Sequence, residues 1–351
     1  LKEGEFDLKI ESLGGSSNAA TGLDDVHYHV LVPPENVEEG LKLILELLLF
    51  PKIEQDAFEM EKEVVLEEIA QNIEQPDEII YMKLLKECLT PHRYSKPILG
   101  NEKTVKSISP KQMKLFHKNH YVGKNCTLCI AGQLPHDIFS IINNSKLNEL
   151  KSISKEKNIN TKTTFNKGYK KETIPRLEGG RILKAWKLPP AKEQILILGA
   201  EIAATILCEG KSSLIVKALR EEKRIIESID IDLQILEKGG LILLDVSCQK
   251  KNLTIAESEL NKILKELNRD LVTNKDLERA KRLVINNIYF GLELSTQIAS
   301  TLGNQALWGR HQSVLKSIED ISYWTTSRLN ELIFPLFNPE NAFTLIALPE
   351  K

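Results

Sequence analysis

The sequence contains an internal repeat of a helix-forming segment, and this repeat limits the chain to folds built from two similar halves. The first copy, residues 56–71 (DAFEMEKEVVLEEIAQ), spaces its apolar residues as a helix does, with no Gly or Pro between them. The second copy, residues 276–289, aligns with it without a gap when the numbering is shifted by 219. The aligned core positions agree in character: Phe58 with Leu277, Val64 with Leu283, Val65 with Val284, Leu66 with Ile285 and Ile69 with Ile288. Each copy is predicted to form a helix with one buried face.

Two acidic residues distinguish the first copy from the second. Glu61 and Glu68 are seven residues apart, about two helical turns, so both carboxylates project from the same side, close to the apolar stripe. The second copy has Ala280 and Asn287 at these positions, so folding alone does not require the acids. A carboxylate at the edge of an apolar face needs a partner, because burying an unpaired charge is costly or shifts its pKa. That partner could be a cation.

The segments before these helices also resemble each other. Residues 26–48 and 241–267 both have the pattern of a strand, a short connection and an amphipathic helix. The chain is therefore predicted to contain two homologous α+β domains, each a mostly antiparallel sheet with helices on one side. The predicted ranges are 1–147 for the first domain, 148–175 for a lysine-rich linker and 176–351 for the second domain.

The periodicity and the turn residues predict most elements of both domains. Helices are expected at 2–13, 37–49, 56–71, 77–89, 110–120, 136–144, 254–267, 275–292 and 314–329, with a further helix ending before Cys208. Strands are expected at 16–21, 26–32, 126–131, 179–188, 228–236, 241–248 and 342–347. The first two strands should form a hairpin, and Gly14 and Gly15 should end the first helix.

Composition indicates a globular protein and excludes some partners. The 351 residues are 42% hydrophobic and 27% charged, which allows two ordinary cores. A formal net charge of -2 gives no sign of nucleic-acid binding. Charged residues interrupt every apolar run before it reaches the roughly 18 residues of a membrane span, so no membrane partner is expected.

The cysteines favour a reducing environment. The five, Cys88, Cys126, Cys129, Cys208 and Cys248, are odd in number, scattered and mostly set among apolar residues. This usage is typical of free buried thiols, and it predicts a cytoplasmic location.

Other groups that could bind a metal have a simpler interpretation. Cys126 and Cys129 are three apart in a predicted strand, so they should point to opposite faces, and no second Cys pair completes a zinc site. His27 and His29 could chelate a metal from one strand face, but a half-exposed face is the commoner cause of this spacing. The remaining acids of the first helix are interpreted as solvated charge: Glu59, Glu63 and Glu67.

Several short motifs follow one another along the chain in a specific order. The first part carries Leu13-Gly14-Gly15, then Asn18, Ala19 and Thr21, then Tyr28 on a strand. The helix of the repeat has the form E-x-E-x-x-V-x-x-x-E, matched by Glu59, Glu61, Val64 and Glu68. Residues 92–100 (HRYSKPILG), 116–132 (FHKNHYVGKNCTLCIAG) and 210–222 (GKSSLIVKALREE) complete the series. In this order and over nearly the whole chain, the motifs resemble the M16 family of zinc peptidases, which includes insulinase, pitrilysin and the mitochondrial processing peptidase.

The resemblance implies a fold, a cofactor and a reaction. Members have homologous α+β domains (the LuxS/MPP-like metallohydrolase fold) and act as zinc-dependent endopeptidases on peptides or small unfolded polypeptides. An H-x-x-E-H helix supplies two His ligands and a general-base Glu, and a more distant Glu completes the site. By position, Glu68 corresponds to this distant zinc ligand, and Glu61 to a carboxylate that orients the site. Substrate is expected to pair as an added strand along residues 16–21, at Asn18, Ala19 and Thr21, where side chains are small.

The H-x-x-E-H motif is absent from the sequence. None of the seven histidines occurs in such a pattern. The resemblance places the motif roughly 75 residues before Glu68, just upstream of Leu1, so the chain is expected to be a fragment that lacks it. Such a fragment should neither hold zinc tightly nor hydrolyse peptides. The alternative is a non-catalytic member that forms half of a substrate chamber, and either form is expected to pair with another M16 chain as a homodimer or heterodimer.

Overall fold

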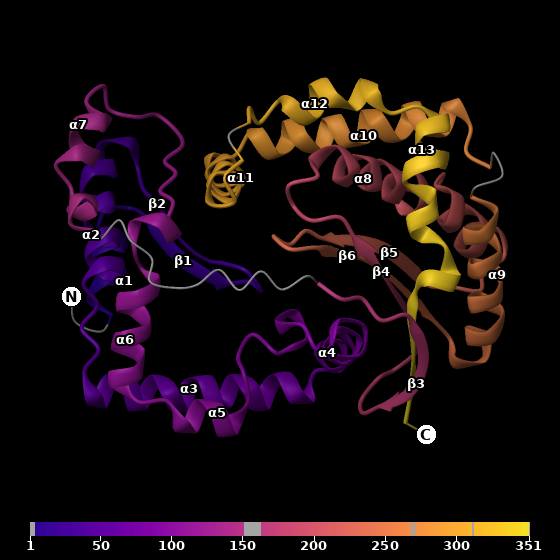
Figure 1. Ribbon diagram of the computed structural model, residues 1–351, viewed down its shortest axis with the longest axis horizontal. Helices are drawn as coiled ribbons and strands as arrows, with labels where there is room; N and C mark the ends of the chain where they lie inside the picture. Colours follow the sequence, from indigo (N-terminus) through magenta and orange to yellow (C-terminus); the bar gives the residue numbers. More distant parts are fainter. Residues whose placement is uncertain (1–3, 151–162, 268–270, 311, 351) are drawn as a thin grey trace. The chain divides into compact units, whose positions relative to one another are not determined.

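The chain forms two compact units (Figure 1). The computed structural model describes residues 4–150, 163–267, 271–310 and 312–350. Unit 1 consists of residues 1–69, 98–160 and 291–314, and unit 2 of residues 70–97, 161–290 and 315–351. Each unit therefore combines stretches that are distant in sequence. Most of the predicted linker, residues 151–162, lies outside the described residues, and its later part forms strand β3 (Gly168–Ile174).

The two units have separate sets of elements. Those of unit 1 are α1 (Glu5–Ser12), β1 (Ser16–Thr21), β2 (Val26–Leu31), α2 (Val37–Leu49), α3 (Gln55–Glu74, which ends in unit 2), α5 (Glu102–Ser107), α6 (Pro110–His120), α7 (Ile138–Asn143) and α11 (Ser295–Leu307). Those of unit 2 are α4 (Pro76–Leu89), β3, β4 (Gly180–Leu188), α8 (Gln194–Cys208), the π-helix η5 (Val216–Glu222), β5 (Ser228–Gln234), β6 (Gly240–Cys248), α9 (Leu253–Glu266), α10 (Asn274–Leu292, whose last residues lie in unit 1), α12 (Lys316–Asp320), α13 (Thr326–Leu332) and β7 (Phe343–Pro349).

The hairpin of unit 1 follows directly from two glycines. Gly14 adopts a positive φ of 73°, which ends α1 as predicted. A Cβ on Gly15 would come within 2.6 Å of the Leu31 carbonyl oxygen, so only glycine allows the chain to pass so close to β2. Strands β1 and β2 then pair antiparallel, from Ser16 opposite Leu31 to Thr21 opposite Val26, which confirms the predicted hairpin.

Among the described residues, helices α1, α2 and α6 contact this hairpin. Phe6 and Ile10 of α1 form a small buried cluster with Leu43 of α2, and Val30 of β2 packs against its edge. The hydroxyl groups of Tyr28 and Tyr121 are 2.6 Å apart, which joins β2 to the end of α6. Burial, and then the hydrogen bond with Tyr28, raises the pKa of Tyr121. The first unit therefore has a modest core beneath a two-stranded sheet.

Unit 2 contains a larger sheet, in the order β3-β7-β4-β6-β5. Only the β3–β7 pair among these is parallel, so the predicted mostly antiparallel α+β architecture is confirmed. Strand β4 pairs with β6 from Gly180 opposite Cys248 to Leu188 opposite Gly240, and with β7 on its other side. It is the central strand of the sheet.

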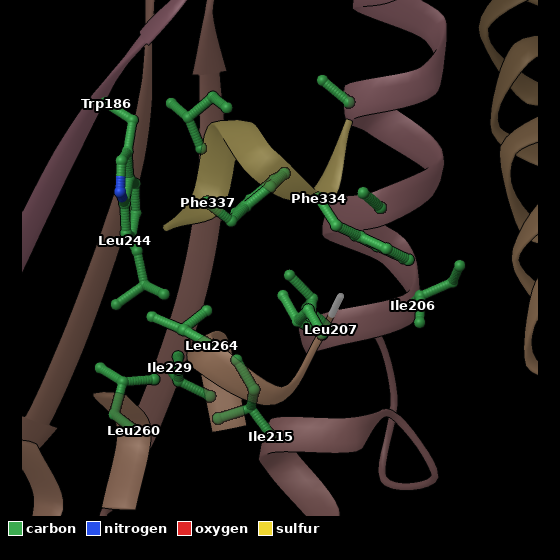
Figure 2. Packing of buried hydrophobic residues seen from close by; sticks show 14 of the residues in the cluster. Trp186, Ile206, Leu207, Ile215, Ile229, Leu244, Leu260, Leu264, Phe334 and Phe337 are labelled. Carbon is green, nitrogen blue, oxygen red and sulfur yellow. The ribbon is translucent and has the colours of Figure 1, made fainter. Parts of the chain in front are cut away.

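Helices cover both faces of this sheet, rather than the single face that was expected. On one face, apolar side chains of the sheet pack with those of α8 and α9, and Figure 2 shows Trp186, Leu244, Ile206 and Leu264 converging with residues of the segment Phe334–Phe337. Neighbouring residues on β4 point the other way, where Arg181 pairs with Asp77 of α4 at 2.8 Å. Helix α4 thus lies against the second face (Figure 1).

Two predictions of local structure are wrong, and some elements were not predicted. Residues 126–131 are not a strand, because no strand of the described chain pairs with them. The helix predicted at 314–329 is divided into α12 and α13: Thr325 accepts a hydrogen bond from the Arg328 backbone at 3.2 Å and starts a new helix, while Trp324 is fully buried against Gly199. Helices α5 and α11, the π-helix η5 and strand β3 were not predicted.

The cysteines agree in part with the prediction of free buried thiols. All five cysteines are free, and Cys88 and Cys248 are fully buried, but Cys126 is exposed. Burial raises the pKa of the half-buried Cys129 thiol, which makes it a poor nucleophile. Among the described residues, no helix is long and apolar enough to cross a membrane.

Candidate metal-ligand helix and strand edge

Helix α3 carries the two candidate acids on the flank of its buried face. Phe58 and Ile69 are its buried residues, and Val65 is half-buried beside them. A separation of seven residues returns to within about 20° of the same direction, so Glu61 and Glu68 project from one flank of this face. Val64 is 47% exposed, so its predicted place in the buried stripe is wrong. It lies on the same side of the helix as the acids, and that side is not covered.

Of the acids on α3, Glu59 has a partner on its own helix, whereas Glu61, Glu67 and Glu68 have no such partner among the described residues and are all exposed. Glu59 forms an ion pair with Lys62 at 2.7 Å and accepts a hydrogen bond from Gln55 at 3.0 Å. Glu61 and Glu68 are exposed, and neither has a hydrogen bond or ion pair with another residue that the structure describes. The expectation that Glu61 and Glu68 lie at the edge of the buried face, apart from the solvated acids, is therefore wrong, because both are as exposed as Glu63 and Glu67.

Helix α10 of unit 2 presents the same positions in a covered environment. It repeats the surface ion pair of α3, because Glu278 and Lys281 at the shifted positions are 3.0 Å apart. Ala280, at the position of Glu61, is fully buried. Asn287, at the position of Glu68, donates to the Glu209 carboxylate at 3.5 Å, directly after α8. In unit 2 the equivalent flank therefore faces helix α8.

In unit 2, a hydrogen-bond network lies at the end of α8, beside the positions that correspond to the candidate metal ligands of unit 1. The Arg279 guanidinium donates to the carbonyl oxygens of Glu209 at 2.8 Å and Thr205 at 3.2 Å. Burial, and then the nearby Glu209 charge, raises the pKa of Glu201 on α8 to about 7. Sequence reasoning missed this network, because Arg279 bonds backbone carbonyls that leave no pattern in the sequence.

The described residues do not by themselves fit a catalytic zinc ion. Such a site needs three protein ligands, and the described part of the chain has no group of three or more His, Cys, Asp or Glu side chains that could hold a metal. His27 and His29 stack with ring centroids 6.2 Å apart on an exposed strand, as the simpler interpretation predicted. Glu68 is thus a single candidate ligand, and its role stays a prediction.

Strand β1 is the outer strand of the β1–β2 hairpin, and one of its edges is open. It pairs with β2 on one side, and no other described strand pairs with it. Asn18, Ala19 and Thr21 are exposed, and the Ala19 backbone N–H donates to the Asn18 side chain at 2.8 Å. Ser17 donates to Asp7 at 2.9 Å, which ties the strand to α1. A strand with an open edge and small exposed side chains is suited to pairing with an extended peptide.

Comparisons with known proteins agree with this arrangement. Residues 2–102 match a family model described as insulinase (peptidase family M16), and residues 107–284 match one described as the peptidase M16 inactive domain. The uncharacterized zinc protease YmxG of Bacillus subtilis is 24% identical over 98% of this chain and 83% of its own length.

Solved structures share the fold. A protease from Helicobacter pylori superposes with a TM-score of 0.86 at 20% identity, over 99% of this chain and 86% of the other. A chain of Complex III2 from Candida albicans superposes with a TM-score of 0.76 at 16% identity, over 97% of this chain and 84% of the other. At these identities the likeness concerns the fold alone.

Proposed function

Because this chain belongs to the M16 (insulinase) family of peptidases, we propose that it forms the main body of a zinc-dependent metalloendopeptidase acting on peptides or small unfolded polypeptides. The observation that carries the proposal is the contrast between α3 and α10. The two helices share their core pattern and their surface ion pair, but only α3 keeps two unpaired acids on one flank. Two carboxylates on a common flank of α3, where α10 has Ala280 and Asn287, could contribute to a cation site.

The roles follow from position. Glu68 would be one zinc ligand, and Glu61 would orient the site by a hydrogen bond to another ligand. Bound zinc in such a peptidase activates a water molecule for attack on the peptide bond. The substrate backbone would add to the edge of β1 at Asn18, Ala19 and Thr21. Since the described residues supply a single ligand, the 351-residue chain alone is expected to hold zinc weakly and to leave peptides intact.

The metal content of Glu68 variants tests the proposal. In the longest natural form of the protein that contains an H-x-x-E-H helix, Glu68→Gln should remove most of the zinc, and Glu61→Gln should weaken zinc binding by about 10–100-fold. Glu59→Gln is the matched control, because Glu59 lies on the same helix but pairs with Lys62. Zinc would be measured by mass spectrometry after dialysis. Full zinc occupancy in Glu68→Gln, or stoichiometric zinc with peptidase activity in the 351-residue chain, would contradict the proposal.

A second candidate is a non-catalytic M16 subunit that pairs with an active chain. It is supported by the single ligand among the described residues and by the inactive-domain family model at 107–284. Under either function we propose a homodimer or heterodimer with another M16 chain, in a reducing compartment such as the cytoplasm. Sedimentation combined with zinc analysis separates the candidates: a zinc-free natural protein that sediments with a zinc-bound M16 chain favours the subunit.

A further inference from the structure

A tyrosine on β2 is the neighbour of the proposed peptide-binding edge across the hairpin. Tyr28 lies directly opposite Ala19 of β1 in the antiparallel register. Directly opposite residues project from the same face of a sheet, with Cβ atoms about 5 Å apart, so the Tyr28 side chain starts beside Ala19. Ala19 is one of the three residues at which a substrate backbone is expected to pair. The position of Tyr28 therefore bears directly on the geometry of this edge.

The hydroxyl group of Tyr28 is bonded to the residue that follows α6. The hydroxyl oxygens of Tyr28 and Tyr121 are 2.6 Å apart, and both side chains are half-buried. Burial raises the pKa of Tyr121, so its hydroxyl group keeps its proton and remains available for this hydrogen bond. The two residues are 93 positions apart, so the bond connects β2 to a distant part of unit 1.

Tyr121 is itself fixed by contacts with the ends of two helices. Its backbone N–H donates to the His117 carbonyl oxygen at 2.9 Å, and its ring stacks on the His117 ring with centroids 4.4 Å apart. The Nε2 atom of His117 donates to the Leu48 carbonyl oxygen at 2.7 Å, because a carbonyl group only accepts hydrogen bonds. Leu48 belongs to the last turn of α2, where carbonyl groups have no partner within the helix. A continuous network thus runs from α2 and α6 through Tyr121 to Tyr28.

The neighbouring level of the hairpin is held in a different way. Val30 packs against the buried cluster of α1 and α2, and Ser17, directly opposite Val30, donates to Asp7 at 2.9 Å. The level of Ala19 and Tyr28 lies two residues further along each strand, and the bond with Tyr121 connects it to the helices. Loss of this bond should therefore loosen the hairpin at Ala19 and leave the level of Ser17 in place.

We propose that Tyr121 is a positioning residue for peptide binding: through Tyr28 it holds the middle of the β1 edge, at Ala19, in the geometry that accepts a substrate strand. This inference rests on the proposed function, because it takes β1 as the edge to which the substrate adds. An incoming strand needs backbone N–H and C=O groups at regular spacing. An edge that is already held in place loses less conformational entropy on binding, so Tyr121 increases affinity without contacting the substrate.

The peptide affinity of the 351-residue chain tests the inference without zinc. The probe is fluorescein-labelled insulin B chain with alkylated cysteines, and fluorescence anisotropy gives its dissociation constant. Tyr121→Phe removes one hydroxyl group and keeps the ring, so it should raise the dissociation constant about threefold to tenfold. Tyr169→Phe is the matched control, because it removes a tyrosine hydroxyl group that donates to Glu257 at 3.1 Å in unit 2. It should leave the dissociation constant unchanged.

Two further measurements separate positioning from a general loss of stability. The double variant Tyr28→Phe with Tyr121→Phe should weaken binding no more than Tyr121→Phe does, because the two hydroxyl groups form a single hydrogen bond. The thermal unfolding midpoint of Tyr121→Phe should stay within about 2 °C of the wild-type value. Amide hydrogen exchange should become faster in the hairpin of Tyr121→Phe and stay unchanged there in Tyr169→Phe.

The outcomes distinguish this inference from the proposed function. Absence of peptide binding by the wild-type chain would contradict the substrate edge of the proposed function, and this inference with it. Binding by the wild-type chain with an unchanged dissociation constant in Tyr121→Phe, equal weakening in Tyr121→Phe and Tyr169→Phe, or unchanged exchange in the hairpin would overturn this inference alone. Selectively weaker binding in Tyr121→Phe, together with faster exchange in the hairpin, supports it.

Discussion

Units 1 and 2 are built from corresponding elements but differ in how completely these elements are covered. Val284 of α10 is fully buried in a core that extends over five strands and several helices, whereas the equivalent Val65 of α3 is half-buried. Ala280 is fully buried, whereas the equivalent Glu61 is exposed. Helices with the same apolar pattern are thus covered on this flank in unit 2 and exposed on it in unit 1. Acidic residues occupy the flank only in the unit where it is open.

The largest expected effect comes from exchanging the residues at this flank. Ala280→Glu should lower the free energy of unfolding by about 3–5 kcal/mol, because it places an unpaired carboxylate in an apolar core. Glu61→Ala should change it by less than about 0.5 kcal/mol. Urea unfolding is followed by circular dichroism, which reports both units, and by fluorescence, which combines Trp186 and Trp324 of unit 2 with Trp308 of unit 1. Equal changes in the free energy of unfolding for the two substitutions would show that the flanks of α3 and α10 do not differ in burial.

A buried lysine on the central strand of unit 2 should make the stability of the protein depend on pH. Lys184 on β4 is 2% exposed and donates to Thr344 at 2.8 Å, and burial lowers its pKa to about 8. This pKa lies below the value of 10.5 in the unfolded chain, so burial of the charged ammonium group destabilises the folded protein. The destabilisation is complete below pH 8 and disappears as the pH rises to about 10.5.

Lys184→Met should therefore stabilise the protein at pH 7 by on the order of 2 kcal/mol, and this gain should vanish near pH 10.5. Thermal unfolding at several pH values measures the difference. A gain that does not depend on pH would show that better packing, and not the buried ammonium group, is responsible.

A matched pair of valines compares the inner strands directly. Val246→Ala should lower the free energy of unfolding by about 2 kcal/mol, because Val246 is fully buried in β6. Val30→Ala, at the equivalent place in β2, should cost less than about 1 kcal/mol, because Val30 is only partly buried. Hydrogen exchange in each strand gives the local loss of stability. A larger loss at Val30 would mean that unit 1 is better packed than its exposure indicates.

The smallest expected effect concerns the ion pairs that the two helices share. Glu59→Gln and Glu278→Gln should each change the free energy of unfolding by less than about 0.5 kcal/mol, because each pair has i,i+3 spacing on one helix and its Glu side chain is exposed. Thermal unfolding at low and high salt measures both. Unequal effects would show that the environments of α3 and α10 differ beyond the flank that carries Glu61 and Glu68.

Elements whose signals are local were predicted well. The hairpin at 16–31, helix α2 and helix α6 occur where glycine, proline and apolar spacing place them. Segments whose state depends on a distant partner were predicted poorly: residues 126–131 have the composition of a strand but no described strand beside them. For the candidate site, the sequence singled out Glu61 and Glu68, but their exposure and lack of partners became visible only in the folded chain.

Consecutive residues determined most of the helices, the hairpin and the side of α3 that carries the two acids, because periodicity and turn chemistry act over a few residues. The tertiary structure decided which surfaces are covered and which segments belong together. Helix α4, close to α3 in sequence, packs on the sheet of unit 2, and Ala280 is buried where Glu61 is not. Burial and strand pairing depend on residues far away in the chain, so the spacing of residues within one segment cannot specify them.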